Sequence, residues 1–530
     1  MPMDVLRWPD DREAIEAVLR ADRGGVSDRV LAVAASICDR VKAEGFKALA
    51  AFTKEFHGVD IASPADVRVS AAALDEALAS ADPRWLGALG RAADNIDAYH
   101  RAQLAGRRAA RVDGDGYSLT ERMDAVPSVA VYVPALEAPL VSTLLMNAVP
   151  AQVAGVERIA VATSLPRGGK SPAPAILAAA AMLGIDEVYC AHGPALMAAL
   201  AYGGIVAPPV DKVVGPGGAM TTAVKKLLSD VVGTDAMAGP SEVVVLADES
   251  APADYVIADL LAQAEHAGDE AALLITTSAE LAEAVALGLE EAASAEPRAE
   301  VIRKSLAGPR SGVVLVPDVE AALELANRFA PEHCVVMTAD ADAVVERLRH
   351  CGCVFVGPYS PVSLGDFYCG TNHILPTGGA ARFQSPLGVD EFLVRSSVVR
   401  YSAGALAEAA DDVMALAEGE GLPAHARAVT VRRVSKGEAG GPVAGLRSGS
   451  VAVRLQAVAD MGAAGDEAAV PALLRALKDA DPSVREAAAL ALMQVADESA
   501  VPWLRDATGD RDARVRAAAE RAVKALSADE

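Results

Sequence analysis

Two residues that could bind a metal ion stand three positions apart in an apolar stretch of the chain. Residues 260–267 read LLAQAEHA, and this Ala- and Leu-rich composition predicts a helix. Positions i and i+3 of a helix lie on one face, so the Gln263 amide and the His266 imidazole could reach one point in space. Two such ligands could hold a metal ion. A local hydrogen bond beside a half-buried histidine is the simpler interpretation of the pair alone.

Further donors of the same kind occur where packing gives little reason for them. The first pair lies at the start of an apolar strand, where burying a charge is costly unless another group pairs with it. A second pair lies in a Gly-rich segment, and a third follows glycines and a proline that end a helix. These pairs are Glu332 and His333, Asp366 and His373, and Glu420 and His425. Such mixed oxygen and nitrogen ligands suit zinc, and they also admit manganese or cobalt.

The elements that must position these residues follow from the hydrophobic pattern. Residues 1–125 alternate apolar and charged positions at helical spacing, which predicts a helical N-terminal region. Short β-branched runs then alternate with Ala-rich helical segments over 126–240 and again over 241–380. This rhythm predicts two parallel-sheet, Rossmann-like α/β units, the second containing the active-site loop. Residues 381–435 are expected to form a C-terminal helical segment.

The end of the chain has a different organisation. Residues 436–450 have the Gly- and Ser-rich composition of a flexible linker. Beyond it, Val-Arg pairs at 453–454, 484–485 and 515–516 recur every 31 residues, each followed by an Ala-rich segment. Residues 451–530 therefore resemble HEAT repeats, an α-solenoid in which neighbouring units bury each other's apolar faces. The repeats fit a docking surface for a protein partner, and they fit a stabilising appendage equally well.

Charge and cysteine usage narrow the class of protein. The 530 residues carry a formal net charge of −24, which argues against binding to nucleic acid or to an anionic membrane. Six scattered cysteines without a Cys-x-x-Cys pair predict reduced thiols rather than a disulfide framework. No segment has the length and composition of a membrane span or a signal peptide. We therefore expect a cytoplasmic protein.

Eight ordered motifs point to one family. They are 131–134 (VYVP), 145–156 (LMNAVPAQVAGV), 210–217 (VDKVVGPG), 238–243 (AGPSEV), 263–266 (QAEH), 330–333 (APEH), 364–373 (LGDFYCGTNH) and 420–425 (EGLPAH). Over about residues 30–434 the chain resembles the histidinol dehydrogenase family. The resemblance implies a zinc-dependent enzyme of histidine biosynthesis that oxidises L-histidinol through the aldehyde to L-histidine with NAD.

The resemblance also implies roles for individual residues. The implied zinc ligands are Gln263, His266, Asp366 and His425, the last of them reaching the site from the partner subunit of a domain-swapped homodimer. His333 would remove the alcohol proton, and Glu332 would activate the water that adds to the aldehyde. The implied substrate contacts are the four zinc ligands together with Ser241, His333, His373 and Glu420. The implied NAD contact is Tyr132.

The nicotinamide side departs from the family pattern. Ala135 and Leu136 replace a glycine pair, Ala195 replaces a glutamine, and Gly218 replaces an asparagine. A lost amide hydrogen bond costs on the order of 1 kcal/mol. Two alternatives therefore stand beside the leading interpretation. One is a paralogous zinc-dependent alcohol dehydrogenase that acts on another small amino alcohol or has a weakened NAD site. The other is a HEAT-repeat docking protein whose catalytic region has lost its enzymatic activity.

Overall fold

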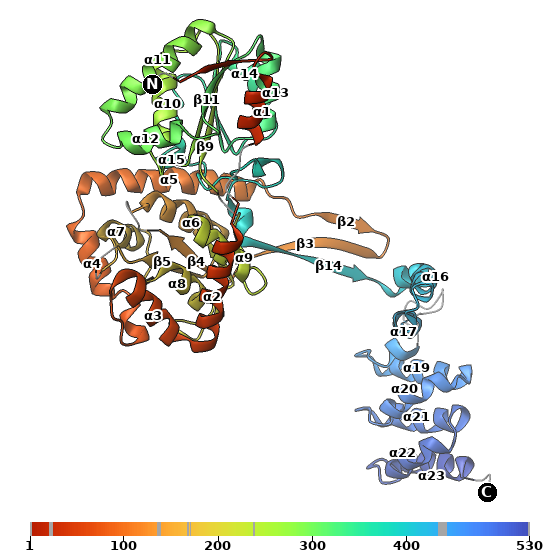
Figure 1. Cartoon of the computed structure of the whole chain (residues 1–530). Coiled ribbons are helices and arrows are strands. Elements are labelled where there is room, and N and C mark those ends of the chain that lie inside the picture. Colours follow the sequence, from red (N-terminus) through yellow and green to blue (C-terminus); the bar gives the residue numbers. More distant parts are fainter. Residues whose placement is uncertain are drawn as a thin grey trace. The chain divides into compact units, whose positions relative to one another are not determined.

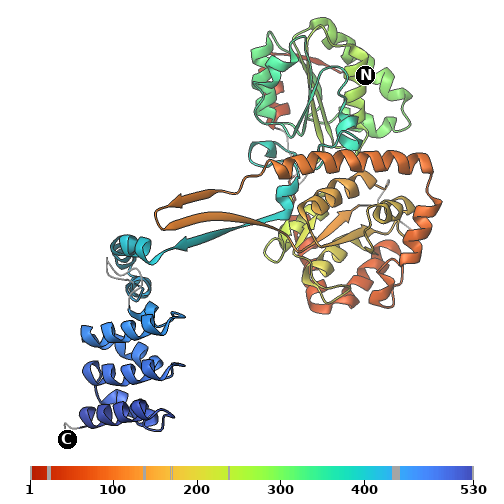
Figure 2. The ribbon, with the colours of Figure 1, turned by 180° about the vertical axis from the view of Figure 1, so that it is seen from behind.

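The chain forms two compact units. The computed structural model describes residues 3–20, 25–134, 139–166, 169, 171–236, 239–432 and 442–527. Unit 1 comprises residues 1–108 and 123–396, and unit 2 comprises residues 109–122 and 397–530. Figures 1 and 2 show the elements of both units from opposite sides. Ala135 and Leu136, which depart from the family pattern, and residues 436–441 of the predicted linker 436–450 lie outside the described residues.

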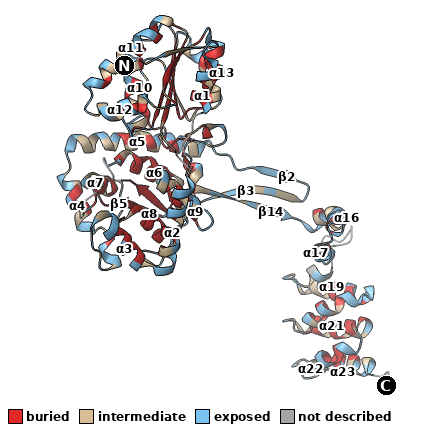
Figure 3. Cartoon of the chain, viewed as in Figure 1, coloured by how far each residue is buried: buried red, intermediate tan, exposed pale blue. Residues whose placement is uncertain are grey.

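The first α/β part of unit 1 contains a five-stranded parallel sheet in the order β6-β5-β4-β7-β8. Its strands are β4 (Ser128–Val133), β5 (Arg158–Ser164), β6 (Glu187–Ala191), β7 (Lys212–Val214) and β8 (Gly233–Thr234). The accompanying helices are α6 (Val141–Ala154), α7 (Pro174–Met182), α8 (Gly193–Tyr202) and α9 (Ala219–Leu228). Helices cover both faces of this sheet, so its central strand β4 is buried along its whole length and most of β5 is buried as well (Figure 3).

The N-terminal helices of unit 1 pack around this first sheet. They are α2 (Asp28–Glu44), α3 (Phe46–His57), α4 (Ala71–Ser80) and α5 (Pro83–Ala105). Helix α2 contacts α8 and α9, and α4 contacts α7. Small side chains such as Ala198 and Ala199 allow α8 to pack closely, and both are fully buried. The predicted helical character of this part of the N-terminal region is confirmed.

The second α/β part contains a six-stranded parallel sheet in the order β1-β11-β10-β9-β12-β13. Its strands are β1 (Val5–Arg7), β9 (Glu242–Ala247), β10 (Ala271–Thr276), β11 (Gly312–Leu315), β12 (His333–Met337) and β13 (Cys353–Val356). Its helices are α1 (Arg12–Arg20), α10 (Ala253–Ala264), α11 (Ala279–Ala295), α12 (Ala299–Leu306), α13 (Val319–Phe329), α14 (Ala341–Val345) and α15 (Val362–Phe367). Two apolar clusters, one on each face, form its core.

Three segments predicted to be helical contain strands instead. Strand β1 is an edge strand of the second sheet, and it pairs with β11 more than 300 residues away. Strands β2 (Arg111–Gly114) and β3 (Tyr117–Ala125) form an antiparallel hairpin, and β14 (Leu393–Tyr401) joins it in a three-stranded sheet. The prediction was wrong at these places because partners far away in the sequence, which local periodicity does not reveal, stabilise these strands.

Unit 2 continues with two helices and then a helical solenoid. The first two helices are α16 (Ala403–Gly419) and α17 (Pro423–Thr430), and the solenoid consists of α18 (Pro442–Gly445), α19 (Val451–Ala464), α20 (Val470–Ala476), α21 (Pro482–Val495), α22 (Val501–Ala507) and α23 (Ala513–Leu526). A continuous apolar core runs through the solenoid. Helix α18 begins at residue 442, so regular structure starts inside the segment predicted as a linker.

The 31-residue recurrence corresponds to a ladder of arginines between successive helices. Arg454 forms a two-pronged ion pair with Asp479 at 2.9 and 3.0 Å, and Arg485 forms the same pair with Asp510 at 2.8 and 3.0 Å. Arg485 also donates to the Asp479 carbonyl at 2.8 Å and is only 5% exposed. The repeated Val-Arg motif therefore places a valine in the core at Val484 and Val515, whereas Val453 is 47% exposed, and it places Arg454 and Arg485 across the interface between repeats.

Replacing Arg485 with alanine is expected to loosen the solenoid around α21 and α22. The change removes a largely buried charge-assisted pair and leaves Asp510 without its cation, at a cost of about 2 kcal/mol. In the full chain, backbone hydrogen exchange in these helices should become roughly 30-fold faster. Arg514, whose side chain is 57% exposed beside Asp512, provides the matched control, and Arg514→Ala should leave exchange unchanged. Equal protection in both variants would show that the ladder contributes nothing.

Candidate active site

The chemistry-bearing residues gather at the amino-terminal edge of the six-stranded sheet. Strands β9 and β12 are neighbours and parallel, with His333 opposite Val243. Glu332 and His333 at the start of β12 therefore lie next to Glu242 at the start of β9. Helix α10 runs antiparallel to the strands and ends at Ala264, which brings Gln263 to the same edge.

The backbone of Glu242 holds both members of the predicted proton-transfer pair. Its N–H donates to the Glu332 carboxylate at 2.8 Å, and its carbonyl oxygen lies 3.2 Å from His333 Nδ1. A ring nitrogen facing a carbonyl oxygen must carry the proton, so Nδ1 is the donor. His333 Nε2 then bears the lone pair, and it faces the Asp366 carboxylate at 3.8 Å. Two acceptors that face each other at this distance attract a cation or a substrate N–H or O–H group.

Burial shifts the pKa of both residues in opposite directions. Desolvation lowers the pKa of His333 to about 4, and the Asp366 carboxylate opposes this shift. Desolvation also raises the pKa of Glu332 well above its usual value, while hydrogen bonds from the Glu242 backbone and from Ser241 lower it. The side chains of Glu332 and His333 are 5% and 4% exposed. A neutral imidazole beside a carboxyl group that holds its proton more tightly can accept a proton and help to move one.

The predicted Gln–His pair is brought together, although not by one continuous helix. Helix α10 ends at Ala264, so His266 lies in the turn that follows it. The helical prediction was wrong at its last residues, where the N–H groups of residues 267–269 bond to the Glu270 carboxylate instead of continuing the helix. His266 Nδ1 bonds to the Gln263 carbonyl oxygen at 3.0 Å, which leaves Nε2 free to act as a ligand.

The environment of the Gln263 side chain differs from that of an ordinary buried amide. Gln263 is 1% exposed, and within the described part of the chain neither its amide oxygen nor its amide nitrogen has a hydrogen-bond partner. Buried amides are nearly always hydrogen-bonded, so an isolated one indicates a missing ligand interaction. The local hydrogen bond that would explain the Gln–His pair without a metal is made by the Gln263 backbone, not by its side chain.

Asp366 and His373 belong to one segment that folds back onto this edge. Asp366 lies on α15, and its carbonyl oxygen is 2.8 Å from His373 Nδ1. Asn372 is buried and donates to the Met146 carbonyl at 2.6 Å, which anchors the segment to α6. Burial lowers the pKa of His373, while Asp366 raises it and His266 lowers it. These mutual effects place Asp366, His266 and His373 within electrostatic range of one another.

A divalent metal ion at this edge would need ligands of different kinds, an amide oxygen as well as imidazole and carboxylate groups. Among the described residues, no three His, Cys, Asp or Glu side chains are grouped closely enough to hold an ion by themselves. A metal site at this edge would therefore need a donor of another kind, such as the amide oxygen of Gln263. Glu420 and His425 lie in unit 2, next to and on α17 respectively, and both are exposed.

Three supporting residues were not predicted from the sequence. Glu242 is fully buried, forms an ion pair with Arg310 and accepts from the Gly378 N–H at 2.8 Å. Asp259, one turn before Gln263, accepts from the Val362 N–H at the start of α15, and burial raises its pKa to about 6. The sequence signal that could have identified these three residues is a charged side chain inside an apolar segment. The sequence did not indicate which residues would pair or form hydrogen bonds with these charged side chains.

The predicted NAD contact lies in the first sheet. Tyr132 is 4% exposed, and its hydroxyl shares a 3.0 Å hydrogen bond with Ser164. Ala195 is fully buried in α8, and Gly218 precedes the first residue of α9. The His192 ring, at the start of α8, stacks on Phe56 with 4.5 Å between the ring centroids.

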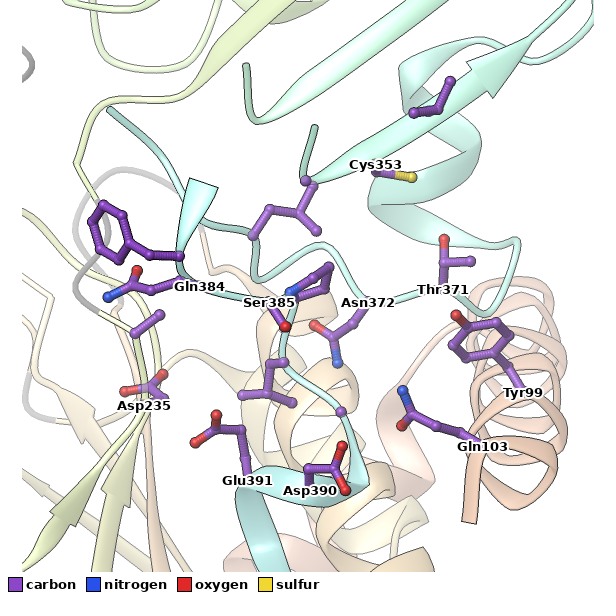
Figure 4. A pocket seen from close by; sticks show the side chains of 18 of the residues that line it. Tyr99, Gln103, Asp235, Cys353, Thr371, Asn372, Gln384, Ser385, Asp390 and Glu391 are labelled. Carbon is purple, nitrogen blue, oxygen red and sulfur yellow. The ribbon is translucent and has the colours of Figure 1, made fainter. Parts of the chain in front are cut away.

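A large cavity of unit 1 lies beside this edge. It has a volume of about 780 Å³, and Figure 4 shows Tyr99, Asp235, Asn372 and Glu391 among its lining residues. Its lining includes Thr371 and Asn372, which precede His373, but none of the predicted site residues. The predicted proton-transfer pair therefore lies at the amino-terminal edge of the second sheet and not in the lining of this cavity.

The fold and the site together define an α/β enzyme with a buried acid–base pair beside metal-type donors. The sequence model described as histidinol dehydrogenase matches residues 22–433, and that of HEAT repeats matches residues 442–524. The chain therefore belongs to the histidinol dehydrogenase family and carries HEAT repeats at its C-terminal end.

Individual relatives agree with this assignment. The histidinol dehydrogenase of Thermobifida fusca is 46% identical over 398 residues, which cover 75% of this chain and 90% of the relative. The histidinol dehydrogenase of Heliobacterium mobile is 44% identical over 75% of this chain and 92% of its own length. The crystal structure of histidinol dehydrogenase from Elizabethkingia anophelis superposes with a TM-score of 0.75 at 30% identity, covering 81% of this chain and 98% of that one.

Proposed function

We propose that this protein oxidises L-histidinol through the aldehyde to L-histidine in histidine biosynthesis, using NAD and a zinc ion. The observation that carries the proposal is the buried Gln263 amide, which has no hydrogen-bond partner among the described residues, three positions before His266, whose Nδ1 contact leaves Nε2 available. A docking protein with a retired site has no physical reason to keep an unpaired amide buried at that place.

The residues of this chain would divide the chemistry as follows. His333 Nε2 takes the proton of the substrate hydroxyl while the carbon transfers a hydride to NAD. Water then adds to the aldehyde with Glu332 guiding its proton, and a second hydride leaves the hydrated carbon for a second NAD. Ser241, His373 and Glu420 contact the substrate. Zinc bound by Gln263, His266, Asp366 and the partner's His425 would orient the amino alcohol by binding its nitrogen atoms.

Finer points of organisation belong to the same proposal. The two parallel sheets would be Rossmann-like units of residues 126–240 and 241–380, and residues 381–435 would make the swapped contacts of a homodimer. The HEAT repeats would serve a protein partner. Among the described residues, no helix is both long enough and apolar enough to span a bilayer. A cytoplasmic location is our expectation for an enzyme of amino-acid biosynthesis.

The principal alternative concerns the cofactor and substrate. Ala195 and Gly218 cannot supply the amide contacts of the family, and the Tyr132 hydroxyl is already bonded to Ser164. These features favour a second candidate, a paralogue that keeps the zinc and the acid–base pair but binds NAD weakly or oxidises another small amino alcohol. Manganese or cobalt could also occupy a ligand set of this kind.

Zinc-dependent NADH production from L-histidinol is the expected result for the purified full chain. Metal-stripped protein should be inactive, zinc should restore activity, and two NADH should form per L-histidine. Gln263→Ala should weaken zinc binding, whereas Glu265→Gln at the exposed neighbouring position serves as the matched control. A titration with NAD would measure the cofactor affinity directly.

The outcomes separate the alternatives. Zinc binding without turnover of L-histidinol favours the paralogue, and so does turnover that requires NAD far above its usual concentration. Protein that binds no divalent metal would contradict the proposal and favour the retired enzyme body with a docking tail.

A further inference from the structure

The loop after α10 has its backbone held by side chains at nearly every position. Glu270, which is 4% exposed, accepts from the N–H groups of Ala267 and Gly268, each at 2.7 Å, and of Asp269 at 3.0 Å. A buried carboxylate is costly unless hydrogen bonds compensate its lost hydration, and here it receives three from consecutive backbone groups. The loop that carries His266 is therefore built around this carboxylate.

Helix α12 holds the same loop from a second side. The Ser305 hydroxyl is fully buried and lies 2.8 Å from the Ala264 carbonyl oxygen and 2.9 Å from the Glu270 carboxylate. Arg298, which precedes the first residue of α12, donates to the His266 carbonyl oxygen at 2.8 Å. The backbone is thus held before His266, at the Ala264 carbonyl, and after it, at the His266 carbonyl and the next three N–H groups.

This arrangement determines where the His266 ring points. The ring is tied to the chain by one further contact, from Nδ1 to the Gln263 carbonyl oxygen at 3.0 Å. Because that contact joins two residues of the same turn, it orients the ring only if the turn itself is rigid. The rigidity comes from Glu270 and Ser305. Among the described residues, the Glu270 and Ser305 side chains bond to each other and to the backbone, and to no side chain of a proposed metal ligand.

We propose that Glu270 is a positioning residue, supported by Ser305, that orients His266 for metal binding before the metal arrives. The proposal rests on the proposed function, since it takes His266 to be a metal ligand. A site that is already ordered loses less conformational freedom when the ion binds, and residues behind metal ligands typically change metal affinity 10- to 100-fold when they are replaced. A purely structural role, which would join α10, α12 and β10, predicts a change in stability alone.

The test compares Glu270→Gln with wild type as full chains. Gln keeps the size but presents an N–H₂ group to the backbone donors, so the loop should loosen. We expect the zinc Kd, measured by competition with a chelating dye, to rise roughly 10- to 100-fold. The visible absorption of the cobalt-loaded protein, which reports ligand geometry, should change as well. Ser305→Ala should shift both readouts in the same direction and provides a second variant if Glu270→Gln fails to fold.

Asp248→Asn is the matched control. Asp248 also accepts backbone N–H bonds, from Ser250 at 2.9 Å and Ala339 at 2.8 Å, but it follows β9 at the opposite edge of the same sheet. It should lower the melting temperature of the metal-free protein without changing zinc affinity or the cobalt spectrum. A wild-type zinc Kd and cobalt spectrum in Glu270→Gln would overturn the positioning role, even if its melting temperature fell. Failure of the wild-type chain to bind zinc would overturn the proposed function itself.

Discussion

Replacement of His333 by asparagine is expected to lower turnover by roughly 10²- to 10⁴-fold, the usual contribution of a general base, while zinc remains bound. Asparagine can still donate to the Glu242 carbonyl, which His333 Nδ1 contacts at 3.2 Å, so the strand start should keep its geometry. What it lacks is the ring nitrogen Nε2 that faces Asp366. The effect should therefore fall on the chemical step and not on metal binding.

The measurement combines steady-state rates with zinc content of the same samples. A fall in kcat with full zinc occupancy agrees with the assignment. His350→Asn offers a matched control, since that histidine lies outside the site in the loop before β13, and its activity should be unchanged. A rate in His333→Asn close to wild type would show that another group accepts the proton.

The second large effect is expected when Arg310 is replaced by methionine. Glu242 is 0% exposed, and the change would leave its carboxylate buried without its cation, at a cost of about 3–5 kcal/mol in the free energy of unfolding. Because the Glu242 backbone bonds both Glu332 and His333, turnover should fall together with stability. Chemical denaturation of the full chain, with activity measured in parallel, tests both expectations.

The double variant Arg310→Met with Glu242→Gln is the control for this prediction. It removes the stranded charge, so most of the lost stability should return. Arg347→Met removes an Arg–Glu pair whose side chains are 48% and 63% exposed, and it should have little effect. If the double variant were as unstable as Arg310→Met alone, the loss would come from packing of the arginine, whose guanidinium group lies over the Phe329 ring at 4.5 Å.

The sequence by itself determined the features that depend on neighbouring residues. Alternation of β-branched runs with Ala-rich segments predicted the two parallel sheets, since buried strands are apolar along their whole length. The 31-residue recurrence predicted the solenoid, and its arginines Arg454 and Arg485 form the same ion pair across successive repeats. The donor types of Gln263, His266 and Asp366, together with ordered motifs, were enough to identify the family.

Only the tertiary structure decided how distant segments meet. Strand β1 pairs with β11 and β14 with β3, and the edge of the second sheet brings Glu242 to Glu332 and His333. The turn after α10, with its carboxylate Glu270, replaces the helix that local composition predicted around His266. Local periodicity records which face of an element is buried. The partner across a sheet or behind a loop is selected by the free energy of long-range pairing and burial, which no short window of sequence contains.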